Sequence, residues 1–321
     1  MKDGVLPELV VITGPTATGK STLGIHLAKA VDGEIVSADS MQVYMHMKIG
    51  TAAPTIDEMC GIPHHLIGFV PPRDDYSVAR YVKEAANCVD DILQRGKTPV
   101  IVGGSGLYID SLIKGRNFSA RGDVSLRRKL EKEFDHTGGS AMLEKLREID
   151  ADSAAKLNAN DKKRIVRAFE AFQTTGKPIS QHDRETVTHP QRYSAVRFAL
   201  SFSDREVLYS RIDRRVDDMM SRGLTDEVIS LLDMGVSRGN TSMQAIGYKE
   251  ISAVLTEGTE EDKTGKIKDA VDKIKMESRR YAKRQLTWLR RHDDVVWIIW
   301  NDSPDFNSAV GKIMELLNEK K

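Results

Sequence analysis

The sequence predicts an α/β fold in which a parallel β-sheet, covered by helices, is interrupted by an all-helical insertion. Up to about residue 115, short β-branched runs alternate with helical periodicity, which is the βαβ pattern of a parallel sheet. A glycine-rich sequence typical of phosphate-binding loops follows the first of these runs. Residues 119–190 show no strand pattern, and strand-like sequence returns at residues 192–202.

The first half of the chain predicts three strands and two helices. Residues 9–13 (LVVIT) predict a buried strand, and residues 21–31 predict a helix that Gly33 terminates. Residues 34–39 (EIVSAD) predict the second strand, and residues 98–104 (TPVIVGG) predict the third. Between these two strands, the spacing of apolar residues predicts a helix that begins at Ser77 and ends at Gly96.

Behind the helical segment the strand pattern resumes. Apolar residues alternate through residues 192–202, and Ser203 with Glu206 predicts a capping box for the next helix. Residues 295–300 (VVWIIW) predict a last apolar strand. We therefore expect a core made of residues 1–118 and 191–321, with residues 119–190 as a helical insertion domain.

Composition narrows the class of protein but names no partner. The chain has 321 residues, of which 40% are hydrophobic and 30% charged, and its formal net charge is +1. Cys60 and Cys88 form neither a disulfide framework nor a zinc site, and His64 and His65 have no ligand at metal spacing, so we expect structural hydrogen bonds in a loop. No signal peptide and no apolar run of about 18 residues occurs, so we expect a cytoplasmic protein without a membrane span.

The phosphate-binding loop is the strongest motif. Residues 11–22 (VITGPTATGKST) place Gly14, Gly19, Lys20 and Ser21 in the pattern GxxxxGK[ST], between a predicted strand and a predicted helix. Such a loop points backbone N–H groups at an anion, the helix N-terminus adds positive potential, and the Ser hydroxyl can bind Mg²⁺. The sequence therefore predicts a core like that of P-loop NTPases and kinases.

Asp39 follows the second strand at the sheet edge where the phosphate-binding loop also emerges. Three roles are open to it: a cap for the following turn, a magnesium ligand, or a general base beside the phosphates. The third strand ends in glycines, where a nucleotide hydrolase carries a metal-binding Asp, which disfavours nucleotide hydrolysis. Ser105, between Gly104 and Gly106, lies either in a tight turn or beside a ligand.

Basic residues concentrate in three places. The helix after Ser203 carries Arg215 beside Val216, where an arginine at the edge of the buried face can reach phosphate oxygens. Residues 275–291 (KMESRRYAKRQLTWLRR) hold seven Lys or Arg against one Glu; the interleaved Trp288 either stacks on bases or packs in the core. Residues 161–170 (DKKRIVRAFE) form the third tract. One phosphate loop and two basic helices indicate a small and a large anionic substrate.

Taken in order, the motifs GPTATGKS, SADSMQVY, IGTAAP, PHHLIG, GGSGLY, NDKKRIVRAFE, QAIGYKE and KRQLTWLRR resemble the tRNA dimethylallyltransferase family. The resemblance spans residues 14–291 and, because no Cys/His zinc finger follows the core, is to the short bacterial form. It implies transfer of a dimethylallyl group from dimethylallyl diphosphate to N6 of adenosine 37 in tRNA. It also implies Mg²⁺ as cofactor and the anticodon stem-loop as partner. We expect a monomer.

The resemblance also implies roles for particular residues. Asp39 would be the general base, with Thr16, Lys20 and Arg215 as further catalytic residues and Ser21 as the Mg²⁺ ligand. The diphosphate would be bound by Gly14, Pro15, Thr16, Ala17, Thr18, Gly19, Lys20, Ser21 and Thr22. The tRNA would be bound by Asp39, Ser40, Met41, Gln42, Ser105, Arg127, Lys163, Arg164, Arg167, Gln244, Gly247, Tyr248, Lys249, Lys283, Arg284, Gln285, Trp288 and Arg290.

Three rival functions remain at this point. An adenylate isopentenyltransferase would use the same donor with a free nucleotide, but the basic residues 283–291 and the long insertion favour tRNA. A P-loop kinase would phosphorylate a small alcohol, and a nucleic-acid-binding module would keep the loop without chemistry.

Overall fold

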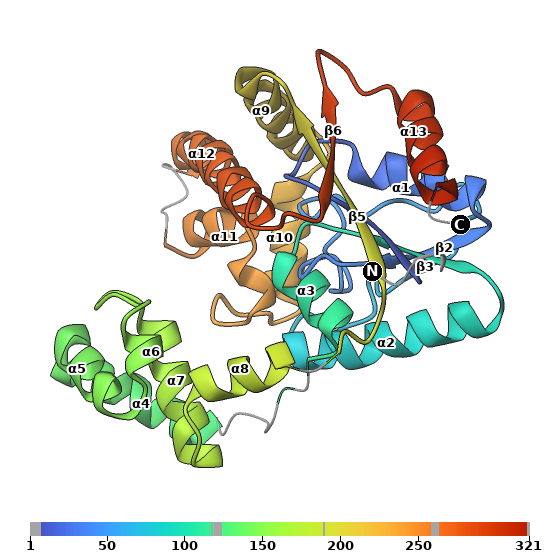
Figure 1. Ribbon diagram of the computed structural model, residues 1–321. Helices are drawn as coiled ribbons and strands as arrows, with labels where there is room; N and C mark the ends of the chain where they lie inside the picture. Colours follow the sequence, from blue (N-terminus) through green and yellow to red (C-terminus); the bar gives the residue numbers. More distant parts are fainter. Residues whose placement is uncertain (1–7, 117, 119–123, 189, 258–262, 320–321) are drawn as a thin grey trace. The chain divides into compact units, whose positions relative to one another are not determined.

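The chain forms two compact units in a computed structural model, which describes residues 8–116, 118, 124–188, 190–257 and 263–319 (Figure 1). One unit combines Met1–Ile113 with Tyr193–Lys321, and the other is Lys114–Arg192. The domain bounds expected from the sequence, 118/119 and 190/191, fall within a few residues of this division.

The larger unit is built on a six-stranded sheet in which all strands are parallel. The strand order is β3-β2-β4-β1-β5-β6. The strands are β1 (Leu9–Thr13), β2 (Gly33–Ser37), β3 (His64–His65), β4 (Thr98–Val102), β5 (Ala195–Phe202) and β6 (Val295–Trp300). The predicted α/β fold class is confirmed. Because the strands are parallel, the segments after β1, β2, β4 and β5 emerge at one edge.

Two predictions around the second strand are wrong in detail. Gly33 does not end the first helix, which stops at Ala30; Gly33 is the first, buried residue of β2, where a Cβ would lie 2.6 Å from the Thr98 carbonyl oxygen. His64 and His65 form the short strand β3 rather than a loop. Their expected structural hydrogen bonds are present, from His64 Nδ1 to the Ile62 carbonyl (2.7 Å) and between His65 Nε2 and Glu34 (2.8 Å).

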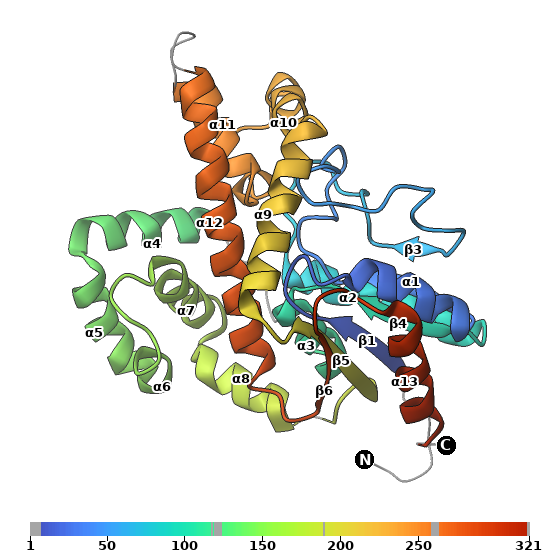
Figure 2. The same ribbon diagram turned by 90° about the horizontal axis from the view of Figure 1, so that it is seen from above.

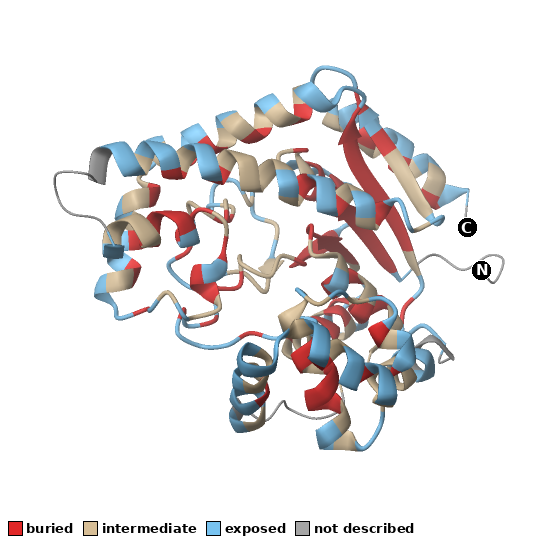
Figure 3. Ribbon diagram, turned by 90° about the vertical axis from the view of Figure 1, so that its left-hand side faces the viewer, coloured by how far each residue is buried: buried red, intermediate tan, exposed pale blue. Residues whose placement is uncertain are grey.

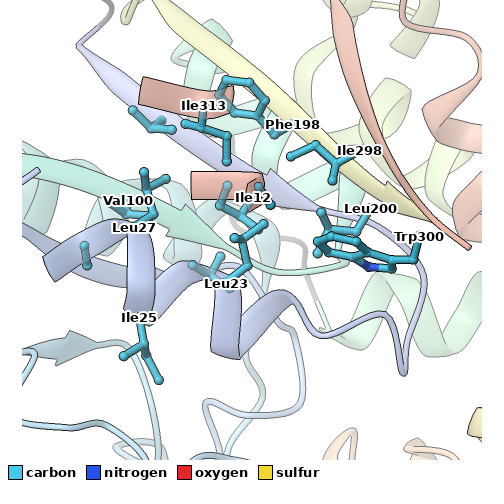
Figure 4. Packing of buried hydrophobic residues seen from close by; sticks show 14 of the residues in the cluster. Ile12, Leu23, Ile25, Leu27, Val100, Phe198, Leu200, Ile298, Trp300 and Ile313 are labelled. Carbon is cyan, nitrogen blue, oxygen red and sulfur yellow. The ribbon is translucent and has the colours of Figure 1, made fainter. Parts of the chain in front are cut away.

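Helices cover both faces of this sheet (Figures 1 and 2). Helices α1 (Lys20–Ala30) and α13 (Phe306–Asn318) lie on one face, and α2 (Val78–Gln94) and α3 (Gly106–Lys114) lie on the other. Figure 3 shows the central strands fully buried, and Figure 4 shows Ile12, Leu23 and Phe198 packed in the core that α1, α13 and the sheet share. Because β1 and α1 are both packed in this core, the positions of the two ends of the loop between them are fixed.

The helix N-termini were partly predictable. Ser77 caps α2, and its side chain accepts a hydrogen bond from the Arg80 N–H (3.2 Å), as predicted. The predicted capping box at Ser203 is wrong: Asp204 is the cap of α9 (Arg205–Ser221), and its carboxylate accepts from the Glu206 N–H (2.8 Å). Asp is as good an N-cap as Ser, so the residue pattern alone did not separate the two.

The remaining elements of the larger unit gather beyond the strand ends. They are α10 (Leu224–Asp233), the 3₁₀ turn η1 (Ser242–Gln244), α11 (Tyr248–Glu257) and α12 (Lys263–Leu289). Helices α9 and α12 run side by side (Figure 2). Two ion pairs tie them together, Arg279–Asp213 at 2.5 Å and Lys275–Asp217 at 2.6 Å.

The described residues of the smaller unit form helices and their connections, without a strand. It contains α4 (Val124–Thr137), α5 (Gly139–Ile149), α6 (Ala151–Ala154), α7 (Lys162–Thr175) and α8 (Ile179–Thr188). Its own core is formed by apolar residues from four of these helices, Leu130, Met142, Leu146, Ala154, Ile165, Val166, Ala168 and Phe169. Within the basic tract 161–170, Ile165, Val166 and Phe169 lie on the face of α7 that packs into this core.

Candidate active site

The phosphate-binding loop connects β1 to α1 at the carboxyl edge of the sheet. Gly19 adopts φ = 87°, a left-handed conformation that glycine tolerates, and a Cβ there would lie 2.9 Å from the Phe306 ring. The Thr18 hydroxyl donates to the Pro15 carbonyl (2.8 Å) and closes the loop on itself. The N-terminus of α1 has no side-chain cap and no acidic residue in its first turn. Its N–H groups are therefore available to an anion.

Two side chains from distant helices support this loop. Gln285 on α12 accepts a hydrogen bond from the Thr16 N–H (3.0 Å) through Oε1 and donates to the Gly104 carbonyl (3.0 Å) through Nε2. Arg211 on α9 donates to the Ala17 carbonyl (3.1 Å). Gln285 is buried and both ends of its amide are engaged. It therefore braces the loop, and its expected contact with tRNA stays a prediction.

The glycines after β4 make room for protein side chains. A Cβ at Gly104 would lie 2.1 Å from Gln285 Nε2, and one at Gly106 would lie 2.3 Å from the Trp288 ring. The Trp288 indole donates to Asp110 Oδ2 (3.2 Å). Of the two roles left open for Trp288, the structure shows the packed one.

Asp39 lies just beyond β2, and the structure shows one of the three roles considered for it, that of a cap. Its Oδ1 accepts hydrogen bonds from the N–H groups of Met41 (2.9 Å) and Gln42 (3.3 Å), so it caps the turn that follows. The same side chain lines a cavity. Ser105 supports this turn, because its hydroxyl accepts from the Ser40 N–H (3.1 Å).

Two cavities meet at this edge of the sheet. The first, of about 430 Å³, is lined by the phosphate-binding loop, α9 and α12. The second, of about 280 Å³, is bordered by apolar side chains, namely Met41, Ile212, Val216, Met219, Ala245, Ile246 and Ile274. Four residues line both cavities: Thr16, Asp39, Arg215 and Tyr281. A ligand in either cavity would therefore contact the same dividing wall.

The electrostatics of the first cavity favour an anion. Lys20 donates to the Pro15 carbonyl (2.8 Å), and burial together with the nearby Arg215 guanidinium lowers its pKa to about 7, although Asp39 opposes the shift. Burial also lowers the pKa of Arg215. Two cations that destabilise each other in a confined space are stabilised when a phosphate group enters between them.

A second side chain that holds a loop of the site, Glu227, could not be identified from the sequence. Glu227 on α10 accepts hydrogen bonds from three successive backbone N–H groups, those of Lys48, Ile49 and Gly50, at 2.9–3.1 Å. The Tyr248 hydroxyl donates to the same carboxylate (2.5 Å). This clamp holds the loop that gives Gly50 and Thr51 to the second cavity. Tyr248 is fully buried and its side chain supports the site from behind this loop, and the expected contact with tRNA stays a prediction.

Other predicted tRNA residues of the larger unit differ in exposure. Gln244 lines the second cavity and donates to the Arg238 carbonyl (2.6 Å); Lys249 is exposed, whereas Gly247 is buried. Along α12, Lys275, Arg279 and Arg280 are paired with acidic residues. Lys283, Arg284 and Arg290 are exposed, and among the described residues none of them has an acidic partner. These three therefore remain available to a phosphate backbone.

In the helical unit, two of the predicted arginines share a buried carboxylate. Glu170 is fully buried, and its Oε2 accepts from Arg127 (3.0 Å) and Arg167 (2.8 Å). Its Oε1 has no hydrogen-bond partner within the part of the chain described. Lys163 and Arg164 are exposed beside an open groove that Arg167 also lines. This unit thus presents a basic surface of its own.

The fold and site together define an α/β protein of the P-loop type with a second, apolar cavity beside its phosphate loop. A family model described as IPP transferase matches residues 42–292, and one described as isopentenyl transferase matches residues 7–68. The first match covers more than half of the chain. The chain belongs to the IPP transferase family, and the predicted family and enzyme class are confirmed.

Individual relatives agree with this assignment. The tRNA dimethylallyltransferase of Caldanaerobacter subterraneus subsp. tengcongensis is 44% identical over 317 residues, 98% of each chain. The full-length tRNA isopentenylpyrophosphate transferase of Bacillus halodurans is 40% identical, with a TM-score of 0.71 over 97% of this chain and 96% of that one. A eukaryotic dimethylallyltransferase captured acting on tRNA is 30% identical, with a TM-score of 0.80 over 98% and 80%. No described helix could cross a membrane.

Proposed function

We propose that this chain transfers a dimethylallyl group from dimethylallyl diphosphate to N6 of adenosine 37 in tRNA and releases diphosphate. The observation that carries this proposal is the pair of cavities that meet at Thr16, Asp39, Arg215 and Tyr281. One cavity suits the diphosphate and the other suits a flat, largely apolar base. The relatives named tRNA dimethylallyltransferase support the same reaction.

The first cavity would hold the leaving group. The N–H groups of the loop and of the α1 N-terminus, with Lys20 and Arg215, would bind the diphosphate oxygens. As the allylic C–O bond breaks, its electron pair passes to the diphosphate, and these donors stabilise the charge that develops there. Gln285 and Arg211 contribute indirectly, because they hold the loop in place.

The second cavity would receive the adenine. A base next to the anticodon must leave its stack to enter, at a cost of roughly a few kcal/mol that contacts along the tRNA offset. The exocyclic amine is a weak nucleophile because its lone pair is delocalised into the ring. Asp39 would accept its proton as the new C–N bond forms. The hydrogen bonds from Met41 and Gln42 fix one carboxylate oxygen of Asp39 and so orient the other.

The residues of the first cavity also fit a Mg²⁺ ion. Mg²⁺ takes oxygen ligands, keeps several waters, and is usually bound by one or two protein groups together with substrate phosphates. Ser21 and Asp218 offer such oxygens. Among the described residues no cluster of three or more His, Cys, Asp or Glu could hold a metal alone, which agrees with a site completed by the diphosphate. The bound ion would neutralise negative charge on the leaving group.

The test is to incubate the chain with labelled dimethylallyl diphosphate and either tRNA or AMP, and then to analyse tRNA nucleosides by mass spectrometry. Dimethylallyladenosine in tRNA is the expected product. Label in AMP alone would contradict the tRNA reaction and identify an adenylate isopentenyltransferase. Label in neither acceptor would contradict prenyl transfer altogether and favour a small-molecule kinase.

A further inference from the structure

Tyr281 lines both cavities, and it is the sole aromatic residue among the described residues that line either of them. It lies on α12, one helical turn before Gln285, which braces the phosphate loop. Its side chain is half-buried. The role inferred for it below rests on the proposed function.

The reacting carbon must lie at the wall where Tyr281 stands. The diphosphate would be held in the first cavity, and the amine would be activated by Asp39 from the second. C1 of the dimethylallyl group, whose bond to the diphosphate oxygen is replaced by a bond to N6, has to lie close to both cavities. Thr16, Asp39, Arg215 and Tyr281 are the residues common to both cavities, so they surround that carbon.

The breaking bond creates an electrostatic conflict at this wall. Positive charge develops on the allylic carbons while Lys20 and Arg215, which are needed for the diphosphate, stand close by. A group that stabilises this cation must carry negative potential and must not react with it. The face of an aromatic ring meets both conditions, because its quadrupole attracts cations without offering a reactive lone pair.

We propose that the Tyr281 ring flanks the dimethylallyl group and stabilises its allylic cation through the π face. In this step the C1–O electron pair leaves with the diphosphate, the N6 lone pair forms the C1–N6 bond, and the N6 proton passes to Asp39. Tyr281 itself gains and loses no atom. It is a catalytic residue because it touches the reacting carbons.

Three observations on Tyr281 support this role. The Arg284 guanidinium lies 5.7 Å from the ring centroid, so a face of this ring already accepts a cation. Ser105, which supports the turn after Asp39, lies beside the phenol and partly offsets the rise of its pKa. Burial and the nearby Asp39 raise the pKa of Tyr281 to about 12, so the phenol stays protonated and does not trap the cation as a phenolate would.

The test compares single-turnover rates of prenyl transfer to tRNA in Tyr281→Leu, Tyr281→Phe and wild type. We expect about a tenfold lower rate in Tyr281→Leu, with the affinities for donor and tRNA changed by less than about threefold, because the ring acts in the transition state. Tyr281→Phe keeps the ring and should stay within about threefold of wild type. Tyr209→Leu is the matched control, since Arg205 also lies 5.5 Å from its ring but Tyr209 lines neither cavity.

A second series removes the remaining structural explanation. Phenylalanines with one and then three ring fluorines at position 281 keep the shape of the ring and weaken its quadrupole stepwise, so the rate should fall stepwise. Equal rates across that series, wild-type rates in Tyr281→Leu, or equal losses in Tyr281→Phe and Tyr281→Leu would each overturn the role of the ring. A wild-type chain that transfers no prenyl group would instead overturn the proposed function.

Discussion

The phosphate loop of the core and the basic surface of the unit Lys114–Arg192 are both suited to phosphate, but they are built differently. The loop presents backbone N–H groups that β1, α1, Gln285 and Arg211 hold in place. The helical unit presents long side chains, and a buried carboxylate already engages two of its arginines. A backbone site is fixed when the fold forms, whereas a side-chain surface depends on which of its charges are already paired.

The largest effect on the rate of prenyl transfer is expected at Asp39, which lines both cavities of the larger unit. In Asp39→Asn the side-chain oxygen that accepts from Met41 and Gln42 is retained, while the basic carboxylate is lost. Removing a general base lowers rates by about 10²–10⁴-fold, so single-turnover prenyl transfer should fall by that amount.

The control for Asp39→Asn is its melting temperature and its affinity for tRNA, both of which should match wild type. Transfer at the wild-type rate would contradict the role of Asp39 as the base. A large loss of stability with normal transfer per folded molecule would show that Asp39 serves only as a cap.

The next prediction concerns the helical unit. Glu170→Ala leaves Arg127 and Arg167 without their shared carboxylate, but both are partly exposed and can turn to water. We therefore expect the free energy of unfolding of the helical unit to fall by about 1–3 kcal/mol. Hydrogen exchange should rise in α4 and α7 and stay unchanged in β1 and β4.

Glu144→Ala is the matched control, because its pair with Arg147 is exposed on the same unit and should contribute under about 1 kcal/mol. Equal effects of the two substitutions would mean that the buried carboxylate does not organise the helical unit. A loss of protection that extends to β1 would mean that the two units unfold together.

The same contrast explains what the sequence could predict. The phosphate loop was predictable because its pattern is local: Gly14, Gly19, Lys20 and Ser21 all lie in one short, continuous segment of the sequence. The Glu227 clamp was not, because its partners at residues 48–50 are brought to it only by the fold. Gln285 and Tyr248 stand in recognisable motifs, but nothing in a motif says whether a polar side chain faces a ligand or supports a neighbour.

A smaller effect is expected for single exposed charges that we propose to contact tRNA. Arg290→Gln, just after the end of α12, and Lys163→Gln on α7 each remove an exposed cation. Each contact to single-stranded RNA contributes about 0.7 to the slope of log affinity against log salt, so each substitution should flatten the slope by about that amount. Arg280→Gln is the control, because Arg280 is exposed but paired with Glu277 (2.7 Å). An unchanged salt dependence of tRNA affinity in Lys163→Gln would contradict the proposal that this face of the helical unit contacts tRNA.

The smallest expected effect is the uptake of a proton by the chain when the diphosphate binds. Burial and Arg215 lower the pKa of Lys20 to about 7 in the free chain, so this amine is largely neutral at about pH 8. A bound diphosphate favours the charged form and raises this pKa, so binding should take up almost one proton at about pH 8 and almost none at about pH 6. Calorimetry in two buffers of different ionisation enthalpy measures this uptake.

Lys20→Arg separates the protein's proton from those of the ligand. Its guanidinium stays charged at both pH values, so any uptake that remains in this variant belongs to the diphosphate. The uptake at about pH 8 should therefore be larger in wild type than in Lys20→Arg, and equal at about pH 6. Equal uptake at both pH values would mean that the Lys20 amine is already charged before the anion arrives. The core site would then attract its ligand through fixed charge, like the charge of the exposed Lys163 and Arg164 on the helical unit.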